Sequence, residues 1–249
     1  MTHTHHTAEP VALTENAIVG GLVAAVPARS RVFEQLGIDY CCGGKLPLAE
    51  ACRKKGLDPH TVVQMLAAFD TAAAAPAPEL NPATMTLTAL ADHIVATHHA
   101  YLRTELPRLD VITEKVARVH GSHDARLAGV RQAFVALSDE MHSHMHKEEQ
   151  ILFPMIRQLE DSRDLSVLHC GSLAHPINQM ESEHDSAGGS LALMRELSDG
   201  FAPPDWACNT YRAMLDGLAQ LERDLHQHVH KENNVLFPRA MELEASLAN

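Results

Sequence analysis

A short phrase that occurs twice constrains this chain more than any other feature of its sequence. Residues 142–154 read HSHMHKEEQILFP, and residues 226–238, which begin 84 positions later, read HQHVHKENNVLFP. Each copy has a histidine followed four residues later by a glutamate, namely His144 with Glu148 and His228 with Glu232. Residues four apart lie on one face of a helix, so two facing helices would direct two imidazoles and two carboxylates to one point. This donor set predicts a pair of iron or manganese ions inside a helical bundle.

The composition narrows the class of protein. A hydrophobic fraction of 45% in 249 residues supports a substantial core, and an aromatic fraction of only 4% favours helices. The net charge of −12 argues against nucleic acid or an anionic membrane as the main partner. No apolar run approaches the roughly 18 residues of a membrane span, and the start, MTHTHHTAEP, lacks a signal-peptide pattern. Because five cysteines without regular spacing do not indicate a disulfide framework, we expect a cytoplasmic protein.

The expected architecture is all-α, with a short helical N-terminal domain followed by an up-down four-helix bundle. An Ala/Pro-rich stretch, TAAAAPAPELNP, is expected to form an extended linker between the two. The chain is therefore divided into a disordered His-containing tail at 1–12, a helical domain with a Cys-Cys motif at 13–70, the linker at 71–82 and the bundle at 83–249.

Apolar residues in the bundle recur with the helical period, and we find no convincing strand alternation there. Four long helical segments are predicted, at 84–118, 124–159, 174–198 and 205–245. The Leu-Phe-Pro within each copy of the repeat predicts a kink or a local irregularity, because proline has no N–H to donate and its ring crowds the preceding turn.

Helical phase indicates which histidines face the core. Six residues share the apolar stripes of the four segments: His99, His144, Glu148, His184, His228 and Glu232. The other histidines of the repeat lie on the opposite face, so we expect four residues to point outward: His142, His146, His226 and His230. A single inward histidine is usually an ordinary core residue, but here each of the four helices carries one, and two of these helices also carry an inward glutamate. Burying a carboxylate is costly unless a cation compensates its charge, which favours a metal.

Four imidazoles and two carboxylates suit two metals. If both carboxylates bridge, each metal keeps one or two positions for water, an oxo bridge, O2 or NO, which favours small-ligand chemistry over a structural role. Glu140 precedes His144 by one helical turn, and Glu183 adjoins His184. Either glutamate could line a proton or ion path, and an ordinary solvated carboxylate is an equally good interpretation of each. A zinc ribbon is excluded because the chain has no Cys-x-x-Cys pairs.

Several separated motifs together resemble one known family. They are DYCCGGK at 39–45, DHI at 92–94 followed by His99, SHMHKEEQILFPMI at 143–156, MESEHD at 180–185 and HVHKENNVLFPRA at 228–240. The C-terminal part is similar to hemerythrin-like domains, and the whole chain resembles the repair-of-iron-centres proteins. The resemblance implies two non-haem irons held by the same six residues, with Glu148 and Glu232 bridging them. Three departures from the family pattern leave these six positions unchanged: His98 replaces a usual aromatic residue, the loop at 160–175 is longer and carries Cys170, and the His-bearing tail is extra.

The resemblance also implies a function, the repair of iron–sulfur clusters damaged by nitrosative or oxidative stress. Damaged iron–sulfur proteins would be the partners, NO or O2 the small ligands, and a homodimer is compatible with the sequence. Iron donation and reduction of NO to N2O both remain open, so enzymatic activity is undecided. Thiolates of Cys41 and Cys42 could take iron, NO or a cluster fragment in transit; the alternative is a turn with two packed cysteines. The competing function is a hemerythrin-like NO or O2 carrier or sensor without turnover.

Overall fold

The computed structural model describes residues 11–72, 81–168 and 171–248, and every regular element within these ranges is a helix. Two compact units are distinguished, one formed by Met1–Ala91 with His226–Asn249 and the other by Asp92–Leu225. Among the described residues, no helix combines the length and the apolar character that a membrane crossing requires. The predicted all-α class is confirmed.

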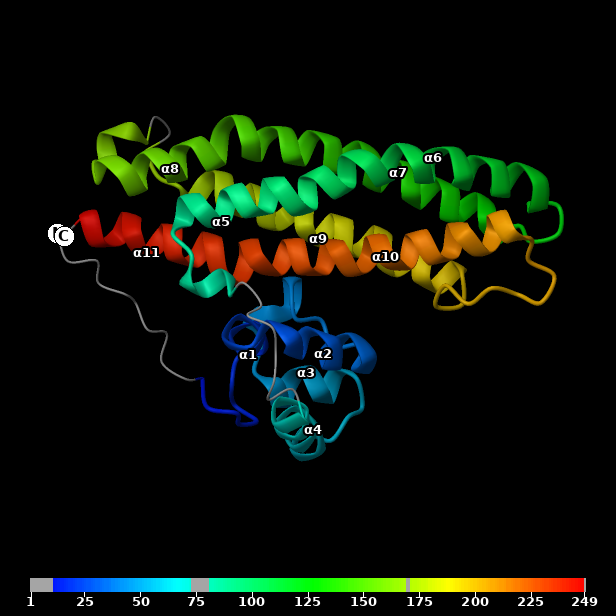
Figure 1. The fold of residues 1–249 in the computed structure, drawn as a ribbon, viewed down its shortest axis with the longest axis horizontal. Helices are drawn as coiled ribbons and strands as arrows, with labels where there is room; N and C mark the ends of the chain where they lie inside the picture. The colour runs from blue at the N-terminus through cyan, green and yellow to red at the C-terminus, as the bar shows by residue number, and fades with distance from the viewer. Residues whose placement is uncertain (1–10, 73–80, 169–170, 249) are drawn as a thin grey trace. The chain divides into compact units, whose positions relative to one another are not determined.

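The four long helical segments predicted from the hydrophobic period are present. The first joins α5 (Leu87–Ile94), the π turn η4 (Val95–His99) and α6 (Ala100–His120). The second joins α7 (Arg126–Lys147), the π turn η5 (Glu148–Leu152) and α8 (Phe153–Ser162), and a short 3-10 turn η6 (Leu165–Val167) follows. The third is α9 (Ala174–Leu197), and the fourth joins α10 (Asn209–Lys231), the π turn η7 (Glu232–Leu236) and α11 (Phe237–Leu247). Within the unit Asp92–Leu225, α6, α7, α9 and α10 run in alternating directions, as in an up-down bundle (Figure 1).

The core of the unit Asp92–Leu225 is built from the apolar stripes of α6, α7, α9 and α10. Its buried members recur three or four residues apart on each helix, as the period of an amphipathic helix requires. They include Leu102, Leu106, Leu109, Phe134, Leu137, Met141, Leu191, Met194, Leu218, Leu221 and Leu225. Methionine and leucine dominate this core, in agreement with the low aromatic content.

Three π turns interrupt the long helices, and two of them end directly before Phe-Pro. Pro154 and Pro238 lack the N–H of a regular helix and their rings crowd the carbonyl four residues earlier, so a wider turn relieves the conflict. The irregularity predicted at Leu-Phe-Pro is therefore confirmed. The third turn, η4, contains no proline, and its extra residue places both His98 and His99 in the interior. Helical phase directed only His99 of this pair inward, so the burial of His98 was not predicted.

The N-terminal part of the other unit consists of short helices. They are α1 (Val19–Ala25), η1 (Pro27–Arg29), α2 (Ser30–Leu36), η2 (Cys42–Lys45), α3 (Leu48–Lys54), α4 (Pro59–Ala72) and η3 (Pro82–Thr84). Gly37 ends α2 with a φ of 64°, a left-handed conformation that glycine adopts without strain. Leu22, Phe33 and Tyr40 lie in the apolar core formed by these N-terminal helices.

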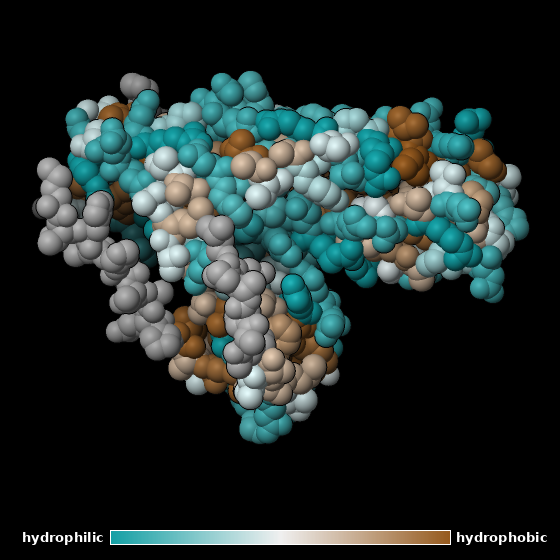
Figure 2. All heavy atoms as spheres, in the orientation of Figure 1, coloured by the Kyte–Doolittle hydropathy of each residue, from teal (hydrophilic) through white to brown (hydrophobic). Residues whose placement is uncertain are grey.

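The surface visible in Figure 2 is mostly hydrophilic, in keeping with the net charge of −12. The predicted tail at 1–12 and linker at 71–82 fall largely on positions 1–10 and 73–80, which lie outside the described residues, as does Cys170. The predicted domain boundaries therefore stay a prediction.

Candidate metal centre

All six residues predicted to face the core are buried. Their side chains come from η4, α7, η5, α9, α10 and η7, so each long helical segment contributes at least one of them. The exposed fraction is 1% or less for every member: His99, His144, Glu148, His184, His228 and Glu232. Helix α10 runs continuously from Asn209 to Lys231, so His228 is held by the same helix that contributes Leu221 and Leu225 to the core.

The carboxylate of Glu148 lies between two imidazoles. Its Oε2 atom is 3.2 Å from Nε2 of His99 and 3.3 Å from Nε2 of His144. Nε2 of His184 lies 3.1 Å from Nε2 of His144. In the second copy of the repeat, Nε2 of His228 lies 2.9 Å from Oε1 of Glu232. The Nε2 atoms of all four histidines are thus directed at carboxylate oxygens or at one another.

Two further carboxylates set the tautomers of two of these imidazoles. Nδ1 of His99 donates to Oε1 of Glu149 at 2.6 Å, and Nδ1 of His144 donates to Oε2 of Glu183 at 3.0 Å. A neutral imidazole that donates from Nδ1 presents a lone pair at Nε2. That lone pair faces the carboxylate of Glu148, and two acceptors at such a distance repel each other unless a proton or a cation lies between them. The donor set therefore fits a metal ion.

Both supporting carboxylates are held in the charged form. The pKa of Glu183 is lowered to about 2, mainly by the hydrogen bond from His144. Partial burial of Glu183 acts in the opposite direction, and hydrogen bonds from Lys147 and Gln179 lower the pKa further. Burial raises the pKa of Glu149, but hydrogen bonds from His99 and Arg103 outweigh it and leave the pKa below its ordinary value. Charged carboxylates behind histidines make the ring nitrogens better ligands.

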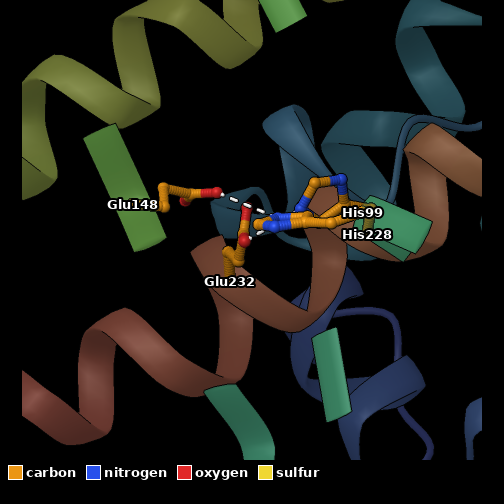
Figure 3. Close-up of side chains that lie close together, drawn as sticks. All are labelled: His99, Glu148, His228 and Glu232. Atoms are coloured by element: carbon orange, nitrogen blue, oxygen red, sulfur yellow. Dashed lines mark hydrogen bonds and ion pairs between the residues drawn. The ribbon is translucent and has the colours of Figure 1, made fainter. Parts of the chain in front are cut away.

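The ligand atoms converge in two overlapping sets. Those of His99, Glu148, His228 and Glu232 lie within 4.8 Å of one another (Figure 3). Those of His144, Glu148, His184 and Glu232 form the second set, within the same limit. Each set offers two imidazoles and two carboxylates, and both carboxylates are shared.

The two glutamates predicted to line a path have different surroundings. Glu183 is buried and holds His144 and Lys147, so it supports a candidate ligand directly. Glu140 is half-buried and accepts a hydrogen bond from Oγ of Ser186 at 3.0 Å. Neither belongs to the two convergent sets, and a role of either in a path stays a prediction.

The Cys41–Cys42 turn forms a separate cluster of possible ligands. Oδ1 of Asp39 accepts from the backbone N–H of Cys41 at 3.0 Å and from its Sγ at 3.2 Å, and Oδ2 accepts from the N–H of Gly43 at 2.9 Å. Cys41 is buried and Cys42 half-buried, and their sulfurs and the Asp39 carboxylate lie within 4.8 Å of one another. A hydrogen bond with Cys42 and then burial raise the pKa of the Cys41 thiol well above its ordinary value.

Helical phase did not identify several residues around these clusters. Glu149 is one such residue, and its position directly after Glu148 is the only sequence signal. His98 pairs with Asp224, with Nδ1 and Oδ1 2.8 Å apart. His230, expected to point outward, is 6% exposed and lies against Tyr40, with ring centroids 5.5 Å apart. That expectation is wrong because another segment of the chain covers the outer face of the helix there.

Comparison with known proteins agrees with this geometry. Residues 90–240 match the model of the hemerythrin HHE cation binding domain, and residues 15–70 match ScdA_N, described as a domain of unknown function (DUF542). The iron-sulfur cluster repair proteins YtfE of Yersinia pseudotuberculosis serotype IB (strain PB1/+) and of Yersinia pestis (strain Pestoides F) are similar over 226 residues. Each is 38% identical to this chain, covering 91% of it and 97% of the relative. The chain therefore carries a hemerythrin HHE domain and belongs to the family of YtfE iron–sulfur cluster repair proteins.

Proposed function

We propose that this protein holds a pair of non-haem irons and repairs iron–sulfur clusters damaged by nitrosative or oxidative stress. One iron would bind His99 and His228, and the other His144 and His184. Glu148 and Glu232 would bridge the two ions. A reducing cytosol is the proposed location, because the thiols of the Cys-Cys turn must stay reduced to serve as ligands.

A single observation carries the two-metal proposal. Glu148 and Glu232 are the only residues that belong to both convergent sets found among the described residues. A carboxylate with two oxygens can serve two cations at once, whereas a neutral imidazole has only one nitrogen lone pair to give to a cation. Two shared carboxylates and two separate pairs of histidines therefore support two cation positions rather than one. Nitrogen and oxygen ligands of this kind suit iron.

The surrounding chain prepares the site for small ligands. Glu149 and Glu183 fix the ring orientation of His99 and His144, so the ligand lone pairs point inward before any metal arrives. Phe153 stacks on the ring of His99, with centroids 5.9 Å apart, and shields it from water. A bound iron pair would supply redox-active cations with open positions for NO or O2.

The relatives' printed name, iron-sulfur cluster repair protein, supports the repair role. We propose that the Cys41–Cys42 turn receives iron or NO in transit. Sulfur ligands suit ferrous iron and NO adducts that leave the harder nitrogen and oxygen site. Damaged iron–sulfur proteins would be the recipients. Reduction of NO to N2O at the iron pair is the alternative activity, and it would make the protein an oxidoreductase.

The proposal is tested by anaerobic reconstitution. Iron-loaded protein is mixed with a [4Fe–4S] hydro-lyase that NO has inactivated, and enzyme activity, iron transfer and N2O are followed together. Reactivation with loss of iron from the donor supports iron donation, whereas N2O without loss of iron supports NO reduction. Reversible NO or O2 binding with neither outcome would favour the competing carrier or sensor. Iron analysis and Mössbauer spectra of the same protein check for two irons per chain, and a single iron or a preference for zinc would contradict the site.

A further inference from the structure

Asn234 links the Cys41–Cys42 turn to the helix that carries Glu232. It lies two residues after Glu232 in the same π turn, η7. Its Nδ2 atom donates to the backbone oxygen of Cys41 at 2.9 Å and to that of Tyr40 at 3.3 Å. Nδ1 of His230, one helical turn earlier, lies 3.3 Å from the same Tyr40 oxygen. Two neighbouring side chains of one helix thus hold the backbone at the start of the cysteine turn.

Two glycines make room for this side chain. A Cβ on Gly44 would lie 2.5 Å from Oδ1 of Asn234, and one on Gly20 would lie 2.2 Å from the same atom. Cβ atoms do not approach an oxygen so closely. The side chain of Asn234 can therefore keep this position only if residues 20 and 44 are both glycine. For Gly44, the nearest atoms all belong to Asn234. The glycine beside the cysteines is therefore explained by the approach of Asn234.

The first copy of the repeat lacks this arrangement. Gln150 occupies the position that corresponds to Asn234, and His146 the position of His230, and both are exposed. The metal-facing positions are alike in the two copies, so the partial burial of Asn234 and its contacts with the cysteine turn are properties of the second copy alone. A role for Asn234 thus concerns the cysteine turn rather than the helix itself.

We propose that Asn234 is the positioning residue that holds the Cys41–Cys42 turn in its buried arrangement beside the helix of Glu232. The inference rests on the proposed function in one respect, since it gives the turn a purpose in transfer. In this arrangement Asn234 holds the carbonyl of Cys41, and the residue Cys41 is 5% exposed. When the side chain of Asn234 moves away, the turn loses these hydrogen bonds and the thiol of Cys41 becomes accessible. Because Asn234 and Glu232 share one π turn, a shift of Glu232 on loss of metal moves the side chain that holds the cysteines.

The test measures thiol accessibility in the full-length protein, without any repair assay. Asn234→Ala is treated with iodoacetamide, and the alkylation rate of each cysteine is determined by peptide mass spectrometry. We expect Cys41 to react about tenfold faster than in the wild type, the factor that corresponds to losing roughly one net hydrogen bond. Cys52, buried in the core of the same unit, reports general unfolding and should keep its rate. Gln150→Ala is the matched control and should leave Cys41 unchanged.

A double-mutant cycle separates positioning from a general packing defect. Gly44→Ala alone should raise the alkylation rate of Cys41, because its Cβ would displace Asn234. Combined with Asn234→Ala, it should add nothing further, since the side chain it displaces is already gone. Independent, additive effects of Gly44→Ala and Asn234→Ala on the rate would overturn the proposal.

The remaining outcomes keep the two proposals distinguishable. An unchanged Cys41 rate in Asn234→Ala overturns the positioning role, whatever the protein does in repair. A faster Cys41 rate together with full repair activity supports the positioning role and contradicts transfer through the cysteines. In the wild type, removal of iron should speed Cys41 alkylation, and Asn234→Ala should abolish that difference. Equal rates with and without iron in the wild type would overturn the link to Glu232.

Discussion

The two copies of the repeated phrase share an inner face and differ on the outer one. In both, the histidine and the glutamate four residues later are fully buried, and a π turn begins at the glutamate. On the outer face, Ile151 of the first copy is 52% exposed, whereas Val235 at the equivalent position is 3% exposed. His146 is likewise exposed and His230 buried. Each copy of the repeat thus contributes one His–Glu pair to the candidate metal centre. Only the second copy also contacts a distant segment on its outer face, the backbone of Tyr40 and Cys41.

The largest expected effect tests what the copies have in common. Glu148→Ala and Glu232→Ala should each lose both irons, because each removes a shared carboxylate and leaves the remaining buried ligands without compensation. Iron content per chain and the visible absorption spectrum measure this. His142→Ala and His146→Ala, on the exposed face of the first copy, should retain full iron. A Glu232→Ala protein that keeps one iron would show that the two copies are not equivalent.

A smaller effect is expected from the carboxylate behind the first copy. Glu183→Ala should weaken iron binding about 10–100-fold, because His144 loses the acceptor that orients its ring. Competition with a chelator of known affinity gives the ratio. Glu140→Ala removes a carboxylate of similar charge that contacts only Ser186 among the contacts described, so it serves as the control. Equal losses in both variants would point to long-range charge rather than ring orientation.

The outer face should distinguish the copies in stability. Val235→Ala should lower the free energy of unfolding of the metal-free protein by about 1–3 kcal/mol, because it removes buried methyl groups. Ile151→Ala should stay within about 0.5 kcal/mol of the wild type, as exposed substitutions do. Urea unfolding followed by circular dichroism gives both values. If the two variants lost equal unfolding free energy, burial of the outer face of the second copy would not stabilise the protein in solution.

The smallest expected difference lies between His230 and His146. Burial lowers the pKa of His230 to about 4, so the ring is neutral at pH 7 and can serve the Tyr40 carbonyl as a hydrogen-bond donor. His230→Ala should cost about 1 kcal/mol of unfolding free energy, the typical net worth of such a bond. His146→Ala, on the exposed face of the first copy, should cost nothing measurable. The same urea titrations measure both unfolding free energies. A larger loss of stability in His146→Ala than in His230→Ala would contradict the assignment of the second copy as the covered one.

Much of the bundle was predictable because its signals are local. The helical period placed four long segments within a few residues of their observed ends, apart from a later start for the fourth at Asn209. The same period placed His144 and Glu148 on one buried face, since residues four apart stay in phase along a regular helix. The proline of each Leu-Phe-Pro predicted an irregular turn. Each of these inferences depends only on residues within one or two helical turns of one another.

Other features had no local signal. The π turn at Val95–His99 contains no proline, so nothing in its sequence indicated that His98 and His99 would both turn inward. Glu183 looked like a solvated carboxylate or the wall of a path, because its contact with His144 joins residues 39 positions apart. A hydrogen bond between helices depends on how they pack, and a single helix cannot reveal it.

The sequence by itself determined the helices, the inward histidines and glutamates, and their duplication. The tertiary structure alone decided which face of the second copy is covered, and by what. Asn234 and Gln150 occupy equivalent positions in nearly the same phrase, yet only Asn234 holds the Tyr40–Cys41 backbone. The physical reason is that periodicity specifies directions within a helix, whereas burial of an outer face requires a segment about 190 residues away to fold onto it.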